Sequence, residues 1–174
     1  MENKNKINLF ITGGTIDSHW DGKLDTAVIG EKSFLPDYFK ELILYADVDF
    51  TIVCLKDSRN LDSNDLDNLL KGIEKSSSTR IIITHGTYTM SDTARFLAAN
   101  LKRKDQTIIL TGSMIPLSGF IPSDAPFNLG YAIAEVNNLS AGVHLCMNGR
   151  TFNPNEVAKN LAEGKFYSVF DRKQ

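Results

Sequence analysis

The strongest constraint on the fold is a regular alternation between short apolar runs and amphipathic helical patterns along the whole chain. Each run has the length of a strand and is rich in β-branched residues, and each following segment repeats apolar residues at helical spacing. This alternation predicts a parallel sheet covered by helices on both faces, with right-handed crossovers. No shift in composition marks a second domain, so we predict one three-layer α/β/α domain over residues 1–174.

The individual elements can be placed from the same patterns. Strands are predicted at Asn8–Ile11, Asp49–Leu55, Arg80–Thr84, Thr107–Leu110 and Gly142–Met147. Helices are predicted over Pro36–Ala46, from Ser63 to Ser76, after Thr89 or Ser91, from Ser123, and from Asn153 to near Gly164. The sheet should therefore be mostly parallel and Rossmann-like or flavodoxin-like. Residues 16–33 are predicted to form an irregular loop, of a length typical of lids, and the aromatic tail Lys165–Gln174 to cover an edge or contact a partner.

Charge and hydrophobicity exclude several classes of protein. The 19 basic and 21 acidic side chains give a net charge of −2, which provides no electrostatic footprint for nucleic acid or an anionic membrane. No apolar run approaches the roughly 20 residues of a membrane-spanning helix. The apolar run at residues 7–11 is too short for a signal peptide, so we expect a cytoplasmic protein.

The cysteines and histidines predict neither a disulfide nor a metal site. Cys54 and Cys146 each lie in an apolar, strand-like run, where cysteine usually behaves as a small buried hydrophobe. His19, His85 and His144 are far apart and form no metal-ligand spacing with the cysteines. We therefore predict no metal and no organic cofactor.

Hydroxyl-bearing turns follow four of the predicted strands. They are Thr12–Thr15, Asp57-Ser58, Thr84–Thr87 and Thr111–Ser113, and three of them contain glycine. In a parallel sheet these turns meet at one edge, where α/β proteins bind ligands. Glycine lets the backbone approach a ligand and exposes amide donors, which suits a small polar substrate and an oxyanion hole. Threonine or serine beside glycine is also common turn and cap chemistry, so only the convergence of four turns indicates a site.

Two phosphate-binding alternatives fail on sequence. The run Gly13–Ser18 lacks the third glycine of a dinucleotide-binding turn and the Lys-Ser/Thr ending of a P-loop.

Five segments together resemble one family. They are ITGGTID at 11–17, ITHGTYTM at 83–90, LTGSMIP at 110–116, SDAPFNLG at 123–130 and MNGRTFNPNEVAKN at 147–160. With Asp57-Ser58, they are similar to the N-terminal domain of bacterial-type L-asparaginases, and most similar to the short, single-domain members. The resemblance implies an amidohydrolase that releases ammonia from the side-chain amide of L-asparagine or a related small amide. It also implies a homo-oligomer, a dimer or a tetramer.

The resemblance assigns roles to residues that match the family motifs. Thr15 falls on the nucleophile, and Thr87 and Lys159 on the threonine and lysine that assist proton transfer. Ser58 falls on the serine that binds the substrate carboxylate, and Ser113 lies where the family has a residue near the scissile amide. The remaining substrate-binding positions are Gly14, Asp57, Gly86 and Tyr88.

Two departures from the family bear on function. Tyr88 replaces the aspartate that in the family pairs with the lysine and binds the α-ammonium group of the substrate. The loop at 17–33 also lacks the tyrosine that the family places beside the nucleophile. We therefore hypothesise a substrate whose amine is absent, acylated or differently placed, unless Asp17, Asp57 or Asp92 replaces the lost acid. The alternatives are a non-catalytic binding or sensing module with this fold, and an amidase for a modified amino acid.

Four other residues have two interpretations each. His85 could be a base, but a turn histidine with satisfied hydrogen bonds is commoner, and the family's histidine is structural. Trp20 could be a lid aromatic or an exposed anchor for a neighbouring molecule. Arg59 could bind an acidic substrate or be an ordinary surface arginine. Lys159, in a predicted helix, would point to solvent, and only the resemblance makes it a site residue.

Overall fold

The computed structural model describes residues 6–171, and at its centre lies a six-stranded sheet in the order β4-β1-β5-β6-β7-β8. The strands are β1 Lys6–Gly13, β4 Asp47–Lys56, β5 Arg80–Thr84, β6 Thr107–Thr111, β7 Gly142–Met147 and β8 Arg150–Phe152. The first five are parallel and β8 runs antiparallel to β7. The predicted fold, a mostly parallel sheet with helices, is therefore confirmed.

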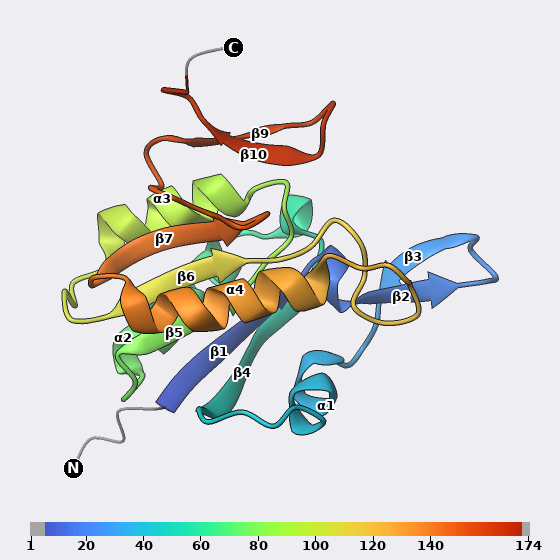
Figure 1. The fold of residues 1–174 in the computed structure, drawn as a ribbon, viewed down its shortest axis with the longest axis horizontal. Helices are drawn as coiled ribbons and strands as arrows, with labels where there is room; N and C mark the ends of the chain where they lie inside the picture. The colour runs from blue at the N-terminus through green and yellow to red at the C-terminus, as the bar shows by residue number, and fades with distance from the viewer. Residues whose placement is uncertain (1–5, 172–174) are drawn as a thin grey trace.

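Helices cover both faces of this sheet, as Figure 1 shows. α2 (Ser63–Lys75) and α3 (Met90–Asn100) pack on one face, and α1 (Leu35–Lys40) and α4 (Ala125–Asn138) on the other. β5 explains why the sheet is buried on both sides. Ile81 and Ile83 pack in the cluster with α2 and α3, and Ile82 packs in the cluster with α1 and α4. A run of three consecutive buried isoleucines is the pattern of a central parallel strand.

Two predicted helix boundaries need correction. The N-cap of α2 is Asp62, one residue earlier than predicted, because its carboxylate accepts hydrogen bonds from the backbone amides of Asn64 and Asp65 in a capping box. α1 ends at Lys40 instead of Ala46. Phe39 is buried in the core, whereas Ile43 and Tyr45, in the next predicted turn, are fully exposed. Helical periodicity beyond Lys40 therefore has no packing to stabilise it.

The predicted last helix is wrong. The segment after β8 forms an antiparallel hairpin of β9 (Val157–Asn160) and β10 (Lys165–Ser168), which lies beside α3 (Figure 1). Val157 and Phe166 are buried against the α3 side of the core. Arg95 of α3 donates hydrogen bonds to the Pro154 and Val157 carbonyl oxygens at 3.0 and 3.2 Å, which anchors the hairpin. Lys159 is therefore a strand residue, and its predicted solvated position on a helix is also wrong.

The segment 16–33 is partly ordered, contrary to the predicted irregular loop. After a short 3₁₀ turn η1 (Thr15–Asp17), β2 (Ser18–Asp21) and β3 (Thr26–Ile29) form an antiparallel hairpin that projects from the carboxyl end of the sheet (Figure 1). The ring of Trp20 makes an edge-to-face contact with Phe120 at 6.3 Å between centroids. Trp20 thus joins the hairpin to the loop that precedes α4, although its side chain stays half-exposed.

Three remaining sequence predictions concern the cysteines, the tail and membrane insertion. Cys54 and Cys146 are free, and burial raises the pKa of each thiol to about 11, so both stay protonated at neutral pH. Residues 172–174 of the predicted tail lie outside the described part of the chain. Among residues 6–171, no helix has the length and apolar character needed to span a bilayer.

Candidate active site

The turns at the carboxyl ends of β1, β4 and β5 touch one another through their backbones. Gly14 has φ +84°, and a Cβ built on it would lie 2.5 Å from the Gly86 Cα atom. A Cβ on Gly86 would in turn lie 2.7 Å from the Ser58 Oγ atom. Both positions therefore require glycine, and three of the four strand-end turns predicted to converge are in contact here.

A threonine and a lysine separated by 72 residues meet at this edge. Lys159 Nζ donates a hydrogen bond to Thr87 Oγ1 at 2.6 Å. Thr87 is only 6% exposed, and Lys159 is partly buried because β9 carries it over the end of the sheet. Burial lowers the pKa of the Lys159 ammonium from its ordinary value. The pair has the arrangement of a hydroxyl beside a base, which is how proteins activate a weak alcohol nucleophile or relay its proton.

Tyr88 lies between two cations at the rim of the site. Its ring is 4.8 Å from the Arg59 guanidinium carbon and 5.1 Å from Lys159 Nζ, and 52% of the residue is exposed. Arg59 also forms a two-pronged ion pair with Asp57, at 3.0 and 2.7 Å. Hydrogen bonding to Arg59 lowers the pKa of Asp57, so this carboxylate is charged and neutralised by its partner. Arg59 thus connects Asp57 to Tyr88, a link that residue order alone did not indicate.

Ser58 joins the turn after β4 to the turn after β5. It begins a 3₁₀ turn, η2 (Ser58–Asn60), is buried, and accepts a hydrogen bond at its Oγ atom from the Thr89 amide at 3.4 Å. Thr89 Oγ1 donates to the Ser58 carbonyl oxygen at 2.9 Å. These bonds hold Ser58 close to Gly86, where its hydroxyl proton can still be donated to a ligand.

Thr15 opens onto a cavity of about 540 Å³ between the β2–β3 hairpin and the end of β4. Asp57 and Arg59 line the same cavity, so they are shared between Thr15 and the Tyr88–Lys159 group. Among residues 6–171, no hydrogen bond joins Thr15 to Thr87 or Lys159. The structure therefore brings Thr87, Lys159 and Tyr88 together, and it connects Thr15 to this group only through the cavity that Asp57 and Arg59 also line.

Ser113 occupies the turn after β6 but is not free to donate. It is buried, and its Oγ atom donates to the Ile115 carbonyl oxygen at 2.6 Å. The loop it stabilises is also held by Asp124, which accepts from the Met114 and Ile115 amides. Ser113 therefore shapes the turn, and its hydroxyl oxygen could only accept from a ligand.

His85 is structural in this arrangement. It is fully buried, its Nδ1 atom lies 2.7 Å from the Gly86 carbonyl oxygen, and its Nε2 atom lies 2.9 Å from Thr93 Oγ1. Because the carbonyl can only accept, Nδ1 carries the proton and Nε2 accepts from Thr93. Burial lowers the pKa of His85 to about 4, so the ring is neutral and fixes the turn that carries Thr87.

None of the three aspartates proposed to replace the family's acid offers an unpaired carboxylate at the rim. Asp57 is paired with Arg59. Asp92 pairs with Arg95 on the surface of α3. Asp17 is fully buried; its Oδ1 atom accepts from the Phe34 amide at 2.7 Å, its Oδ2 atom has no partner, and burial raises its pKa. Asp17 therefore ties down the base of the hairpin and does not reach the cavity.

The described residues contain no group of three or more His, Cys, Asp or Glu side chains placed to hold a metal ion. The polar groups that converge at the sheet edge are instead hydroxyls, one lysine, one arginine and backbone amides. Such a set can orient a small polar molecule and move a proton at an oxygen atom.

The fold and this site define a class of protein: Rossmann-like α/β domains in which a threonine of a strand-end turn lies beside a lysine. Comparison with known families identifies the family within this class. The family described as "Asparaginase, N-terminal" matches residues 6–168, and the chain therefore belongs to the asparaginase family.

Individual relatives agree with this assignment. A glutaminase-asparaginase of Acinetobacter glutaminasificans is 38% identical over 92 residues, which cover 51% of this chain and 27% of the relative. L-asparaginase 2 of Escherichia coli K12 is 30% identical over 162 residues, covering 88% of this chain and 46% of the relative. The solved structure of a probable cytoplasmic L-asparaginase from Campylobacter jejuni superimposes with a TM-score of 0.81 at 31% identity, covering 94% of this chain and 53% of that one. This chain therefore spans about half the length of these relatives, or less.

The neutral, buried His85 predicts a pH dependence of stability. Its folded pKa of about 4 lies below the ordinary value of 6.5, so the unfolded chain binds the proton more readily. The stability this group contributes is complete above pH 6.5 and is lost as the pH falls from 6.5 towards 4. We expect the free energy of unfolding in urea to fall by roughly 2–3 kcal/mol from this group between pH 7.5 and 4.5.

The His85→Gln variant should lose this part of the pH dependence, although it starts less stable. His144→Gln is the matched control, because His144 is only partly buried, and it should retain the wild-type slope. Equal slopes in His85→Gln and wild type would contradict the neutral, buried state.

Proposed function

We propose that this protein is an asparaginase-like amidohydrolase with a threonine nucleophile. The observation that carries the proposal is the 2.6 Å hydrogen bond between Lys159 Nζ and Thr87 Oγ1, in a partly buried site where the pKa of the lysine is lowered. The family supports hydrolysis of an amide as the reaction. The similar Campylobacter jejuni structure is that of a probable cytoplasmic enzyme, and we propose the same location for this chain.

The proposed reaction has two displacement steps. Thr15 Oγ1 attacks the amide carbonyl carbon, its proton passes through the Thr87–Lys159 pair to the leaving nitrogen, and the C–N bond breaks to release ammonia. Water then attacks the threonyl ester, and the carboxylic acid leaves as Thr15 regains its proton. The balance is one amide and one water consumed, one acid and one ammonia formed. The amides of the Gly14 and Gly86 turns would stabilise the oxyanion.

Lys159 must be neutral to accept a proton, and two opposing effects decide this. Burial disfavours the ammonium, whereas the Tyr88 ring at 5.1 Å favours it through a cation–π contact. Burial lowers the pKa of Lys159, which favours the neutral form that the proposed reaction needs. A carboxylate in place of the Tyr88 ring would favour the charged form more strongly, because an opposite full charge outweighs a ring quadrupole.

The proposed substrate carries a carboxylate but no free α-ammonium group. Ser58 and the positive side of the rim provide partners for the carboxylate. The Tyr88 ring carries no full negative charge and already faces Arg59 and Lys159, and Asp17, Asp57 and Asp92 are buried or already paired. A free ammonium would also lie near the Arg59 guanidinium, which disfavours it.

The first prediction concerns the two threonines and the lysine. Each of Thr15→Ala, Thr87→Ala and Lys159→Met should lower ammonia release from a panel of small amides by at least about 100-fold, because each removes a nucleophile or a proton-transfer group. Thr79→Ala, at the opposite end of β5, is the matched control and should keep wild-type activity.

Two outcomes would change the proposal. Activity retained in Thr15→Ala but lost in Thr87→Ala would make Thr87 the nucleophile. If wild type hydrolyses no amide while L-aspartate still raises its melting temperature, the chain is a binding or sensing module, which the loss of the family's acid at Tyr88 also favours.

The second prediction concerns specificity at Tyr88. Wild type should hydrolyse succinamate, which is asparagine without its amine, with a higher kcat/KM than L-asparagine. Tyr88→Asp should reverse this preference by at least about tenfold, because it supplies a carboxylate to the ammonium group. Tyr88→Phe keeps the ring and should keep the wild-type preference. A wild-type preference for L-asparagine over succinamate would contradict the proposed substrate class.

The third prediction concerns assembly. We propose a homo-oligomer, because Ile43, Tyr45 and Phe170 leave large apolar side chains in solvent. Light scattering after size exclusion should give two or four times the chain mass of 19.3 kDa. A monomer at catalytic concentrations would show that the site works without a second copy.

A further inference from the structure

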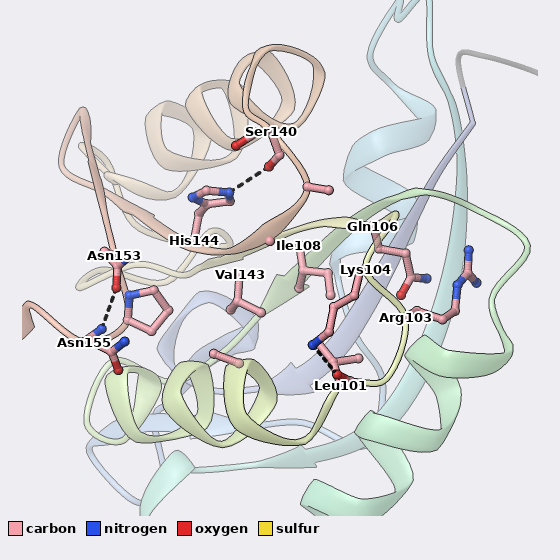
Figure 2. Close-up of a pocket in the computed structure, with 14 residues that line it drawn as sticks. Leu101, Arg103, Lys104, Gln106, Ile108, Ser140, Val143, His144, Asn153 and Asn155 are labelled. Atoms are coloured by element: carbon pink, nitrogen blue, oxygen red, sulfur yellow. Dashed lines mark hydrogen bonds between the residues drawn. The ribbon is translucent and has the colours of Figure 1, made fainter.

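A second cavity lies at the amino-terminal ends of β6 and β7, whereas the candidate active site lies at the carboxyl ends of the strands. It has a volume of about 490 Å³, within the range of small-molecule pockets. Three segments far apart in the sequence enclose it: the end of α3 with the start of β6, the turn into β7, and residues 153–155 (Figure 2). Because β6 and β7 are short strands, this cavity is on the order of 15–20 Å from the strand-end turns.

The lining of this cavity contains basic side chains and no acidic ones. Of its 14 residues three are basic (Arg103, Lys104 and His144) and none is Asp or Glu. Arg103 is neutralised by Asp105, through bonds of 3.0 and 2.7 Å. Lys104 Nζ donates only to the Leu101 carbonyl oxygen, at 2.7 Å, and forms no ion pair among the described residues. An ammonium with two hydrogens to spare therefore faces a cavity that contains no carboxylate.

A buried acceptor without a partner belongs to a residue that lines the same cavity. Gln106 is 2% exposed, and its Nε2 atom donates to the Ile73 and Ser78 carbonyl oxygens at 2.9 and 3.1 Å. Turning the amide over would set its oxygen against two carbonyl oxygens, so the assignment of the two atoms is fixed. Oε1 is therefore the atom left without a hydrogen bond. A buried acceptor in this state is costly and marks a place where a donor fits.

In the view of Figure 2, the Lys104 side chain extends between the Gln106 amide and Val143. Lys104 is held only by its bond to the Leu101 carbonyl oxygen, on the exposed end of α3. Because Lys104 and Gln106 line the same cavity, the cation and the acceptor can serve the same ligand.

The other lining residues indicate which chemical groups the rest of the ligand should carry. Leu101, Ile108 and Val143 present apolar surface, and Asn153 and Asn155 present amides. We propose that this cavity binds a small carboxylic acid that has a compact apolar body and a hydroxyl or amino group beside the carboxylate. Lys104 donates a hydrogen bond to the carboxylate, and Gln106 Oε1 accepts one from the hydroxyl or amino group. The apolar part of the ligand packs against the apolar surface. This site is separate from the amidohydrolase site and does not depend on it.

The test uses 2-hydroxy-4-methylpentanoate as the probe, followed by amide chemical shifts in the ¹⁵N-labelled full chain. Saturable shifts should occur at Ala98, Gly142 and His144 and not at Gly14 or Gly86, which report on the other edge. Lys104→Gln should weaken the Kd by about fivefold or more, since it removes one charged hydrogen bond. Lys102→Gln, an exposed lysine two residues away that does not line the cavity, should leave the Kd unchanged.

A second probe, 4-methylpentanoate, lacks the hydroxyl and isolates the role of Gln106. It should bind at least about threefold more weakly than the hydroxy acid. Equal affinity of the two acids would overturn the assignment of Gln106. The absence of saturable shifts at Ala98, Gly142 and His144, or equal affinity in Lys104→Gln and wild type, would overturn the site itself.

Discussion

Backbone-to-backbone contact between strand-end turns is the constraint on which the site depends. Gly14 lies against Gly86, and Gly86 against Ser58, with no room for a Cβ atom between them. Thr12 Oγ1 adds a hydrogen bond to the Thr84 carbonyl oxygen at 2.9 Å. Because the turns after β1, β4 and β5 are packed this closely, their hydroxyls and amides occupy fixed positions before any ligand arrives. Such preorganisation is what electrostatic stabilisation of a developing oxyanion requires.

Much of this arrangement follows from local sequence. Consecutive β-branched residues in β5 favour a strand buried on both faces, and parallel strands bring their following turns to one edge. The glycines in those turns then predict close approach. The motif-bearing residues Thr15, Ser58 and Thr87 could therefore be assigned to one edge without a structure. Their separation could not, because it depends on how the β2–β3 hairpin and η2 fold back over the sheet.

The segment after β8 shows why the rest could not be predicted. Asn153, Pro154 and the apolar residues up to Leu161 fit a capped helix as well as they fit a hairpin, since short apolar patterns do not separate the two. Tertiary contacts decide: Val157 and Phe166 fill the core beside α3, and Arg95 holds the Pro154 and Val157 carbonyl oxygens. The same contacts place Lys159 over Thr87. A lysine that looks solvated in a helix becomes a site residue only because the segment is a strand.

Tyr88 shows how one substitution can redirect a site without dismantling it. A carboxylate at this position would pair with Lys159 and favour its charged form. The ring instead contacts Lys159 and Arg59 through its face, which holds both side chains in place at a smaller electrostatic cost. Arg59 is balanced by Asp57, so the rim has a net positive charge from Lys159 alone when that group is protonated. The hydrogen bond between Lys159 and Thr87 is thus made beside an uncharged ring, at the position where the resemblance places a carboxylate. In the proposed function Thr87 serves proton transfer and Tyr88 substrate choice, so mutations at the two positions should affect turnover and specificity separately.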